Sequence, residues 1–112
     1  MKAWQEADVL ALEIYIRLKL NKDFSYKDQI QRAAVSIMNN IAEGFERSSN
    51  RAFINHLLIA KGSCGEVRSM LKLGLQLGYF VDADYQSMLL RSTTISKMLQ
   101  GLVNGLVDEK TK

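Results

Sequence analysis

The sequence predicts an all-α protein, an antiparallel up-down-up-down four-helix bundle, and three observations support this prediction. The 112 residues contain no proline and no sustained strand-like alternation of polar and apolar side chains. Apolar residues instead recur with helical periodicity in four stretches. Two of these stretches carry heptad patterns, and short polar segments separate them, which favours antiparallel neighbours.

The first expected helix spans about residues 4–20, and its apolar side chains cover so wide an arc that more than one side requires burial. The second expected helix spans about residues 26–46. We place its start near Tyr26, because the spacing of Ser25 and Asp28 approximates a capping box.

The third expected helix, about residues 50–77, gives the clearest pattern, with apolar spacings of four and three sustained along its length. Its seam consists of Phe53, Leu57, Ala60, Cys64, Val67, Leu71 and Leu75. Gly78 is expected to end it in the left-handed conformation. The fourth, about residues 83–107, has its own seam, and the tail after it is expected to fray. Residues 1–112 are therefore expected to form a single domain.

Composition and the scarcity of reactive side chains argue against catalysis. His56 is the single histidine and Cys64 the single cysteine, so the sequence offers no disulfide framework, zinc site or nucleophile–base pair. We expect His56 to be structural and Cys64 to be a small core residue. No apolar stretch resembles a signal sequence or membrane span. These features predict a cytoplasmic non-enzyme that uses no metal or cofactor and does not enter a membrane.

A second apolar stripe on the third helix indicates burial from two directions. Taking Arg51 as zero on a helical wheel, this stripe lies at about 40–120° and consists of Ile59, Ser63, Glu66, Met70, Leu73 and Leu77. Gly62 and Gly65 leave a shallow groove beside it. Either a neighbouring helix of the same chain fills this groove or another copy of the chain does; we favour self-association.

Hydrogen-bonding side chains form a polar row about 80° wide on the second helix. The row consists of Arg32, Ser36, Asn40, Glu43 and Arg47. One hypothesis is that the row satisfies buried polar partners at a helix or subunit contact, with Glu66 as the favoured partner. Glu43 and Arg47 are spaced to pair on their own helix. The alternative is that this row is an ordinary solvated face.

Basic residues provide the candidate contacts to nucleic acid. Lys61, Arg68 and Lys72 fall within about 40° on the third helix, and Arg47 and Arg51 bracket the preceding loop. These cations either contact phosphates or flank the seam structurally. Because no base-reading module is present, any binding is expected to follow the phosphate backbone with little sequence preference.

Two segments resemble the 23S rRNA intervening-sequence proteins, also called the four-helix-bundle protein family. They are QRAAVSIMNNIAEGFER and LLIAKGSCGEVRSMLKLGLQLGYF, which carry the patterns Ser-Ile-x-x-Asn-Ile-Ala-Glu-Gly and Gly-Ser-x-x-Glu-Val-Arg; ALEIY in the first helix extends the match. The resemblance implies a bundle that assembles into a ring-shaped homopentamer. Met38 stands where that family usually has proline, so the second helix is expected to be straighter here.

The same resemblance implies binding to rRNA or other nucleic acid, and a more distant relative assists a retroelement reverse transcriptase. Our first functional hypothesis is therefore a cytoplasmic homo-oligomer that binds nucleic acid without catalysis. The second is a scaffold or accessory subunit that recruits another protein and does not touch nucleic acid.

Overall fold

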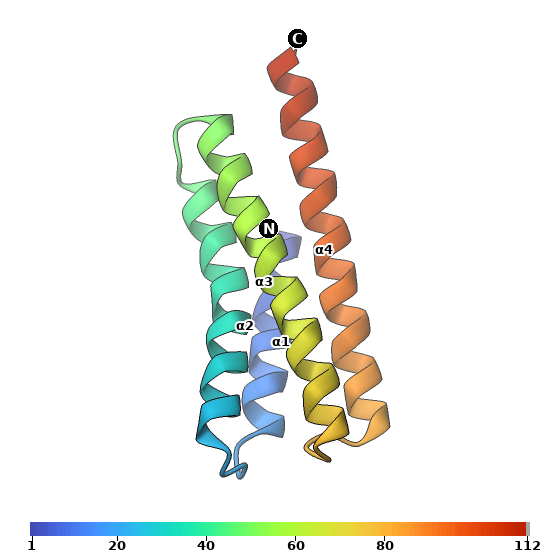
Figure 1. Cartoon of the computed structure of the whole chain (residues 1–112). Helices are drawn as coiled ribbons and strands as arrows, with labels where there is room; N and C mark the ends of the chain where they lie inside the picture. The colour runs from blue at the N-terminus through green and yellow to red at the C-terminus, as the bar shows by residue number, and fades with distance from the viewer. Residues whose placement is uncertain (112) are drawn as a thin grey trace.

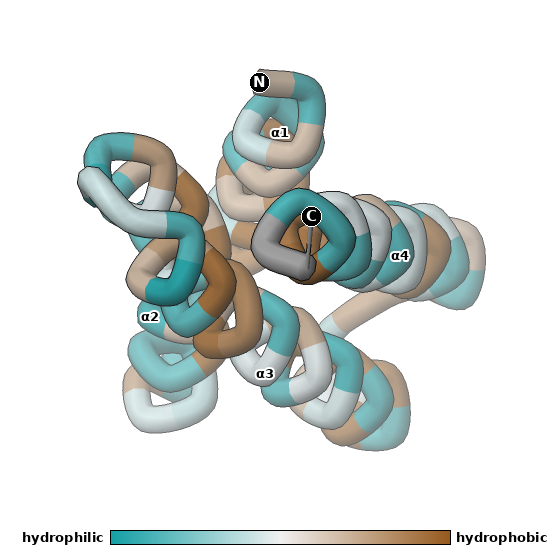
Figure 2. The backbone as a smooth tube through the Cα atoms, turned by 90° about the horizontal axis from the view of Figure 1, so that it is seen from above, coloured by the Kyte–Doolittle hydropathy of each residue, from teal (hydrophilic) through white to brown (hydrophobic). Residues whose placement is uncertain are grey.

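A computed structural model of the chain describes residues 1–111, with side chains for residues 1–109. It contains helices α1 (Lys2–Arg17), α2 (Phe24–Phe45), α3 (Asn50–Gln76) and α4 (Asp82–Thr111). Successive helices run in opposite directions (Figure 1). Seen end-on, they surround a common centre in the order α1, α2, α3, α4, and each contacts the two beside it (Figure 2). The described residues contain no strand, so the all-α class is confirmed.

The core is built from one buried face of each helix, as the periodicity predicts. On α3, the five central seam positions are fully buried, whereas Phe53 and Leu75 are partly buried. Ile14, Ile37 and Leu99 bring the other three helices to the same core. Because the four long helices lie side by side along one axis, the molecule is a rod of 50 × 21 × 19 Å. Helix α2 runs through Met38 without a break.

The helix ends show where local chemistry differs from the prediction. Helix α2 starts at Phe24 because the Asp23 carboxylate accepts a hydrogen bond from the Tyr26 amide at 3.2 Å, so the capping box at Ser25 and Asp28 was wrong. Helix α1 ends at Arg17, before the expected residue 20.

Gly78 ends α3 with φ of 79°, as predicted. The Gly78 amide donates to the Leu75 carbonyl at 3.0 Å, and the Tyr79 amide donates to the Gly74 carbonyl at 2.8 Å. This pair of bonds satisfies carbonyls that the helix end would otherwise leave unpaired.

Helix α4 continues to Thr111, so its predicted end at residue 107 was wrong; the fraying expected of the tail stays a prediction, and Lys112 lies outside the described residues. No proline or glycine follows Gly105 to stop the helix. The Asn50 side-chain amide at the start of α3 also donates to the Glu109 carboxylate at 3.2 Å, which ties this last part of α4 to the bundle.

Two glycines allow helices to approach closely, but they are not those selected from the sequence. A Cβ at Gly44 would collide with Phe53 and His56, and one at Gly74 would collide with the Tyr26 hydroxyl and the Phe80 ring. The Tyr26 hydroxyl donates to the Met70 carbonyl at 2.5 Å. Burial raises the pKa of this phenol further above physiological pH, so it remains a neutral hydrogen-bond donor in alkaline solution as well.

Candidate nucleic-acid interface

Side chains of the polar row on α2 form hydrogen bonds with side chains of α3. Ser36 Oγ lies 2.9 Å from Ser63 Oγ, and the Asn40 amide donates to the Ser36 carbonyl at 2.9 Å. His56 Nδ1 lies 3.0 Å from Asn40 Oδ1, to which it donates in the tautomer protonated at Nδ1. Glu43 Oε2 lies 3.7 Å from the same nitrogen. The short polar side chains therefore face a helix partner, and His56 occupies a structural position.

The prediction that Glu66 is the partner of the polar row is wrong for contacts within one chain. Glu66 is exposed and makes no hydrogen bond or ion pair within the described part of the chain. Arg32 pairs instead with Asp28 on its own helix at 3.0 Å. The predicted pair of Glu43 with Arg47 is also absent, because α2 ends before Arg47 and Glu43 faces His56.

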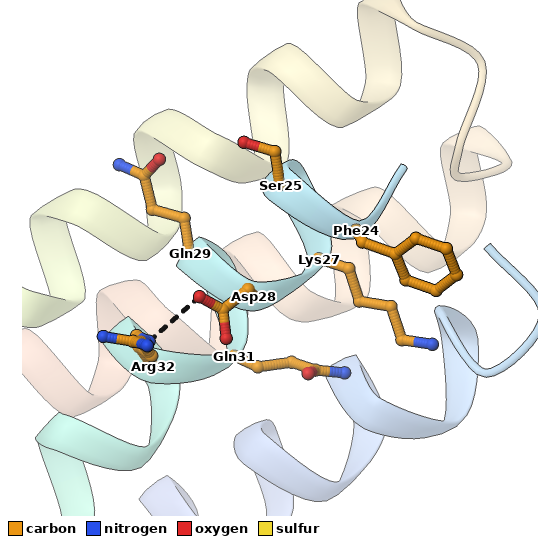
Figure 3. Close-up of a pocket in the computed structure, with 7 residues that line it drawn as sticks. All are labelled: Phe24, Ser25, Lys27, Asp28, Gln29, Gln31 and Arg32. Carbon is orange, nitrogen blue, oxygen red and sulfur yellow. Dashed lines mark ion pairs between the residues drawn. The ribbon is translucent and has the colours of Figure 1, made fainter. Parts of the chain in front are cut away.

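A shallow furrow on the outside of α2 brings no distant residues together. All of its lining residues come from the first turns of that one helix (Figure 3). They are Phe24, Ser25, Lys27, Asp28, Gln29, Gln31 and Arg32. The Asp28–Arg32 ion pair spans it, and Lys27 Nζ lies 5.9 Å from the centre of the Phe24 ring. Since these charged groups satisfy one another locally, the furrow is not a convergent binding site.

The outer face of α3 is uncovered, and the groove at Gly62 is empty. No atom of the described chain would lie within 4 Å of a Cβ at Gly62, and only the Arg68 side chain approaches Gly65. The explanation that a helix of the same chain fills this groove is therefore wrong. Ile59 beside it is 53% exposed and Leu73 is 43% exposed.

A second uncovered apolar face lies on α1, where the sequence shows its wide apolar arc. Val9, Leu12, Tyr15 and Ile16 are all exposed there, although burial on more than one side was expected. In the end-on view, α1 and α3 lie across the bundle from each other (Figure 2). One chain thus presents two separate apolar faces to its surroundings.

The net positive charge belongs to the half of the bundle formed by α3 and α4. Residues 1–49 carry seven basic and seven acidic side chains, whereas residues 50–112 carry eight basic and five acidic ones. Helix α4 has no acidic residue between Asp84 and Asp108. The α3–α4 half therefore produces a positive field that acids of its own do not cancel.

Three candidate cations lie along this half, and the structure adds a fourth. Lys61 Nζ donates to Gln100 Oε1 on α4 at 2.6 Å, Lys72 is exposed, and Arg68 reaches across to α4. Lys97, which we did not select from the sequence, is exposed on α4 one turn before Gln100. The sequence feature that could have identified Lys97 is the absence of acidic residues between Asp84 and Asp108. We call Lys61, Arg68, Lys72 and Lys97 the basic stripe.

The other two candidates, Arg47 and Arg51, are exposed at the far end of α3, beside the α2–α3 loop. The structure thus divides the five predicted contacts between the end of the bundle and the side of α3. Arg91, another basic residue of the α3–α4 half, pairs with Glu6 of α1 and so belongs to a different side of α4.

The structure also locates the chemically reactive groups. Cys64 is fully buried, and burial raises the pKa of its thiol, which suits a core residue better than a nucleophile. No group of three or more potential metal ligands gathers within the described residues. None of the helices in this part of the chain has a stretch sufficiently long and apolar to cross a lipid bilayer.

Comparison with known proteins decides the family. The profile of the family described as 23S rRNA-intervening sequence protein matches residues 1–101. The chain belongs to this family. A solved structure is similar in fold: the crystal structure of a protein of unknown function from the S23 ribosomal protein family of Bacteroides thetaiotaomicron VPI-5482 superposes with a TM-score of 0.85. The two sequences are 30% identical over 90% of this chain and 97% of that one.

The resemblance seen in the two signature helices is thereby confirmed. No curated protein matches this family member. Its function must therefore be argued from its own surfaces.

Proposed function

We propose that this member of the 23S rRNA-intervening sequence protein family is a cytoplasmic, non-catalytic homo-oligomer that binds RNA or other nucleic acid through the phosphate backbone. The observation that supports this proposal best is the concentration of uncancelled positive charge on the α3–α4 half, along the basic stripe. Lysine and arginine side chains that replace condensed counterions gain affinity from each phosphate they contact.

The side chains available at this surface favour backbone contacts over base recognition. The large aromatic residues that are most exposed, Tyr15, Phe24 and Phe45, all belong to α1 and α2. Stacking on bases needs exposed aromatic rings beside the cations, and the basic stripe has no such neighbours on the exposed surface of the described residues. Binding should therefore depend strongly on salt and weakly on sequence.

Self-association completes the proposal, because one chain leaves apolar faces on both α1 and α3 exposed. Another copy of the chain would cover them, and contact between two different faces generates a ring when the rotation closes. The family resemblance makes the ring a homopentamer in our proposal. Such a ring would repeat the basic stripe on every subunit and strengthen the positive field.

A salt titration of the wild-type protein tests the nucleic-acid part of this proposal. Binding of a transcribed, structured fragment of 23S rRNA would be measured by fluorescence anisotropy between about 50 and 200 mM salt. With three or four phosphates contacted by each stripe, the logarithm of the affinity should fall against the logarithm of salt concentration with a slope of about −3. An absence of binding at the lowest salt, with the oligomer intact, would contradict the proposal and favour the protein scaffold.

A further inference from the structure

Arg68 differs from the lysines of the basic stripe because buried groups of α4 hold its guanidinium. One terminal nitrogen, Nη1, donates to Ser96 Oγ at 2.7 Å and to Ser92 Oγ at 3.3 Å. Ser92 is fully buried, and Ser96 is 9% exposed. Ser92 Oγ in turn donates to the Cys64 carbonyl at 3.2 Å, so the hydroxyl that receives Arg68 is itself fixed.

The charge of this guanidinium is not neutralised within the described chain. Arg68 forms no ion pair there, and its hydrogen bonds go to hydroxyls and one carbonyl. An arginine that is partly buried without a carboxylate loses hydration that hydroxyls replace only in part. An anion on its open side would supply the missing countercharge.

The remaining guanidinium nitrogens are available to such an anion. Nε and Nη2 have no hydrogen-bond partner among the described residues, and neither is sealed from solvent. Nη2 lies beside Gly65, where an added Cβ would sit 3.8 Å from it. Because Gly65 has no side chain, nothing from that position covers the guanidinium.

We propose that Arg68 is a preorganised phosphate contact and that Ser92 and Ser96 are the positioning residues that hold it. This inference rests on the proposed binding of nucleic acid and adds to it a residue that is rigid before the ligand arrives. The two nitrogens Nε and Nη2 present parallel N–H groups, which match two oxygens of one phosphate. A lysine must be immobilised on binding, whereas the serines immobilise Arg68 during folding.

The double variant Ser92→Ala/Ser96→Ala tests this inference without changing any surface charge. The affinity for the 23S rRNA fragment should fall about 3- to 10-fold, because Arg68 must then be ordered by the ligand itself. The slope of the salt dependence should change little, since the number of phosphates contacted stays the same. Arg68→Gln should instead lower the magnitude of that slope by about 1.

Two further variants separate positioning from folding. Ser87→Ala/Thr94→Ala also removes two hydroxyls, at exposed positions of α4, and should keep the wild-type affinity. Ser96→Thr retains the hydroxyl and should keep the affinity within about twofold. Circular dichroism would establish that each variant is helical at the assay temperature.

The outcomes distinguish the two proposals. If the wild-type protein does not bind RNA, the proposed function fails and this inference fails with it. If the wild type binds and Ser92→Ala/Ser96→Ala binds equally well, only the positioning role is contradicted. If Arg68→Gln leaves both the affinity and the salt slope unchanged, Arg68 contacts no phosphate.

Discussion

The triple variant Lys61→Glu/Lys72→Glu/Lys97→Glu is expected to bind RNA far more weakly than the wild type. It removes three phosphate contacts and places three carboxylates where phosphates would lie. Each lost contact lowers the magnitude of the salt slope by about 0.9 on duplex nucleic acid, so the affinity at low salt should fall at least about 100-fold. Anisotropy with the same 23S rRNA fragment would measure this loss.

A control variant separates this local effect from the change in net charge. Lys19→Glu/Lys22→Glu/Lys27→Glu makes the same charge change at the opposite half of the chain, around the α1–α2 connection. It should weaken binding much less, because those lysines stand near Asp23 and Asp28 in the sequence and none of them belongs to the basic stripe. Equal losses in the two triple variants would show that only net charge matters, which would contradict the assignment of the surface.

The double variant Ile59→Glu/Leu73→Glu is expected to dissociate the proposed assembly into single chains. Both side chains lie on the uncovered outer face of α3, and burying two unpaired carboxylates in a subunit contact costs several kcal/mol. Light scattering should find a multiple of 12.7 kDa for the wild type and about 12.7 kDa for the variant. Leu90→Glu is the matched control, because Leu90 is 69% exposed on α4, and it should leave the mass unchanged.

A milder change at the groove sharpens this test. In a single chain, Gly62→Ala meets no atom within 4 Å and should stabilise the helix by about 0.5 to 1 kcal/mol. In the proposed assembly, the added methyl group would obstruct the approach of the neighbouring copy. We therefore expect a weaker association. A raised melting temperature with unchanged mass would show that nothing approaches Gly62.

The heptad seams predicted the core well because burial on a long helix is decided by many residues at once. Leu57, Val67 and Leu71 of α3 are all fully buried as their spacing indicated. Helix ends depend on one or two local hydrogen bonds, and the sequence offers several competing caps. Asp23 caps α2 in preference to Ser25, since its side chain is also held by a 2.6 Å hydrogen bond from the Tyr79 hydroxyl, a contact between distant parts of the chain.

Site residues were harder to predict because a helical wheel gives a direction but not the group that it meets. The wheel placed Ser36 and Asn40 on one side of α2. It did not reveal that Ser63 and His56 of α3 lie opposite them. It grouped Arg68 with Lys72, although buried serines hold the guanidinium and the lysine is exposed. The glycines that pack closely, Gly44 and Gly74, depend on bulky partners that no local pattern reveals.

Chemical footprinting of lysines in the wild-type protein tests most directly whether the α3–α4 half binds nucleic acid. An amine-reactive reagent would modify the protein with and without the 23S rRNA fragment at low salt, and mass spectrometry would locate the modified lysines. We expect RNA to protect Lys61, Lys72 and Lys97, while Lys19, Lys22 and Lys27 remain reactive. Equal modification with and without bound RNA at the first three, or protection confined to the second three, would contradict the account.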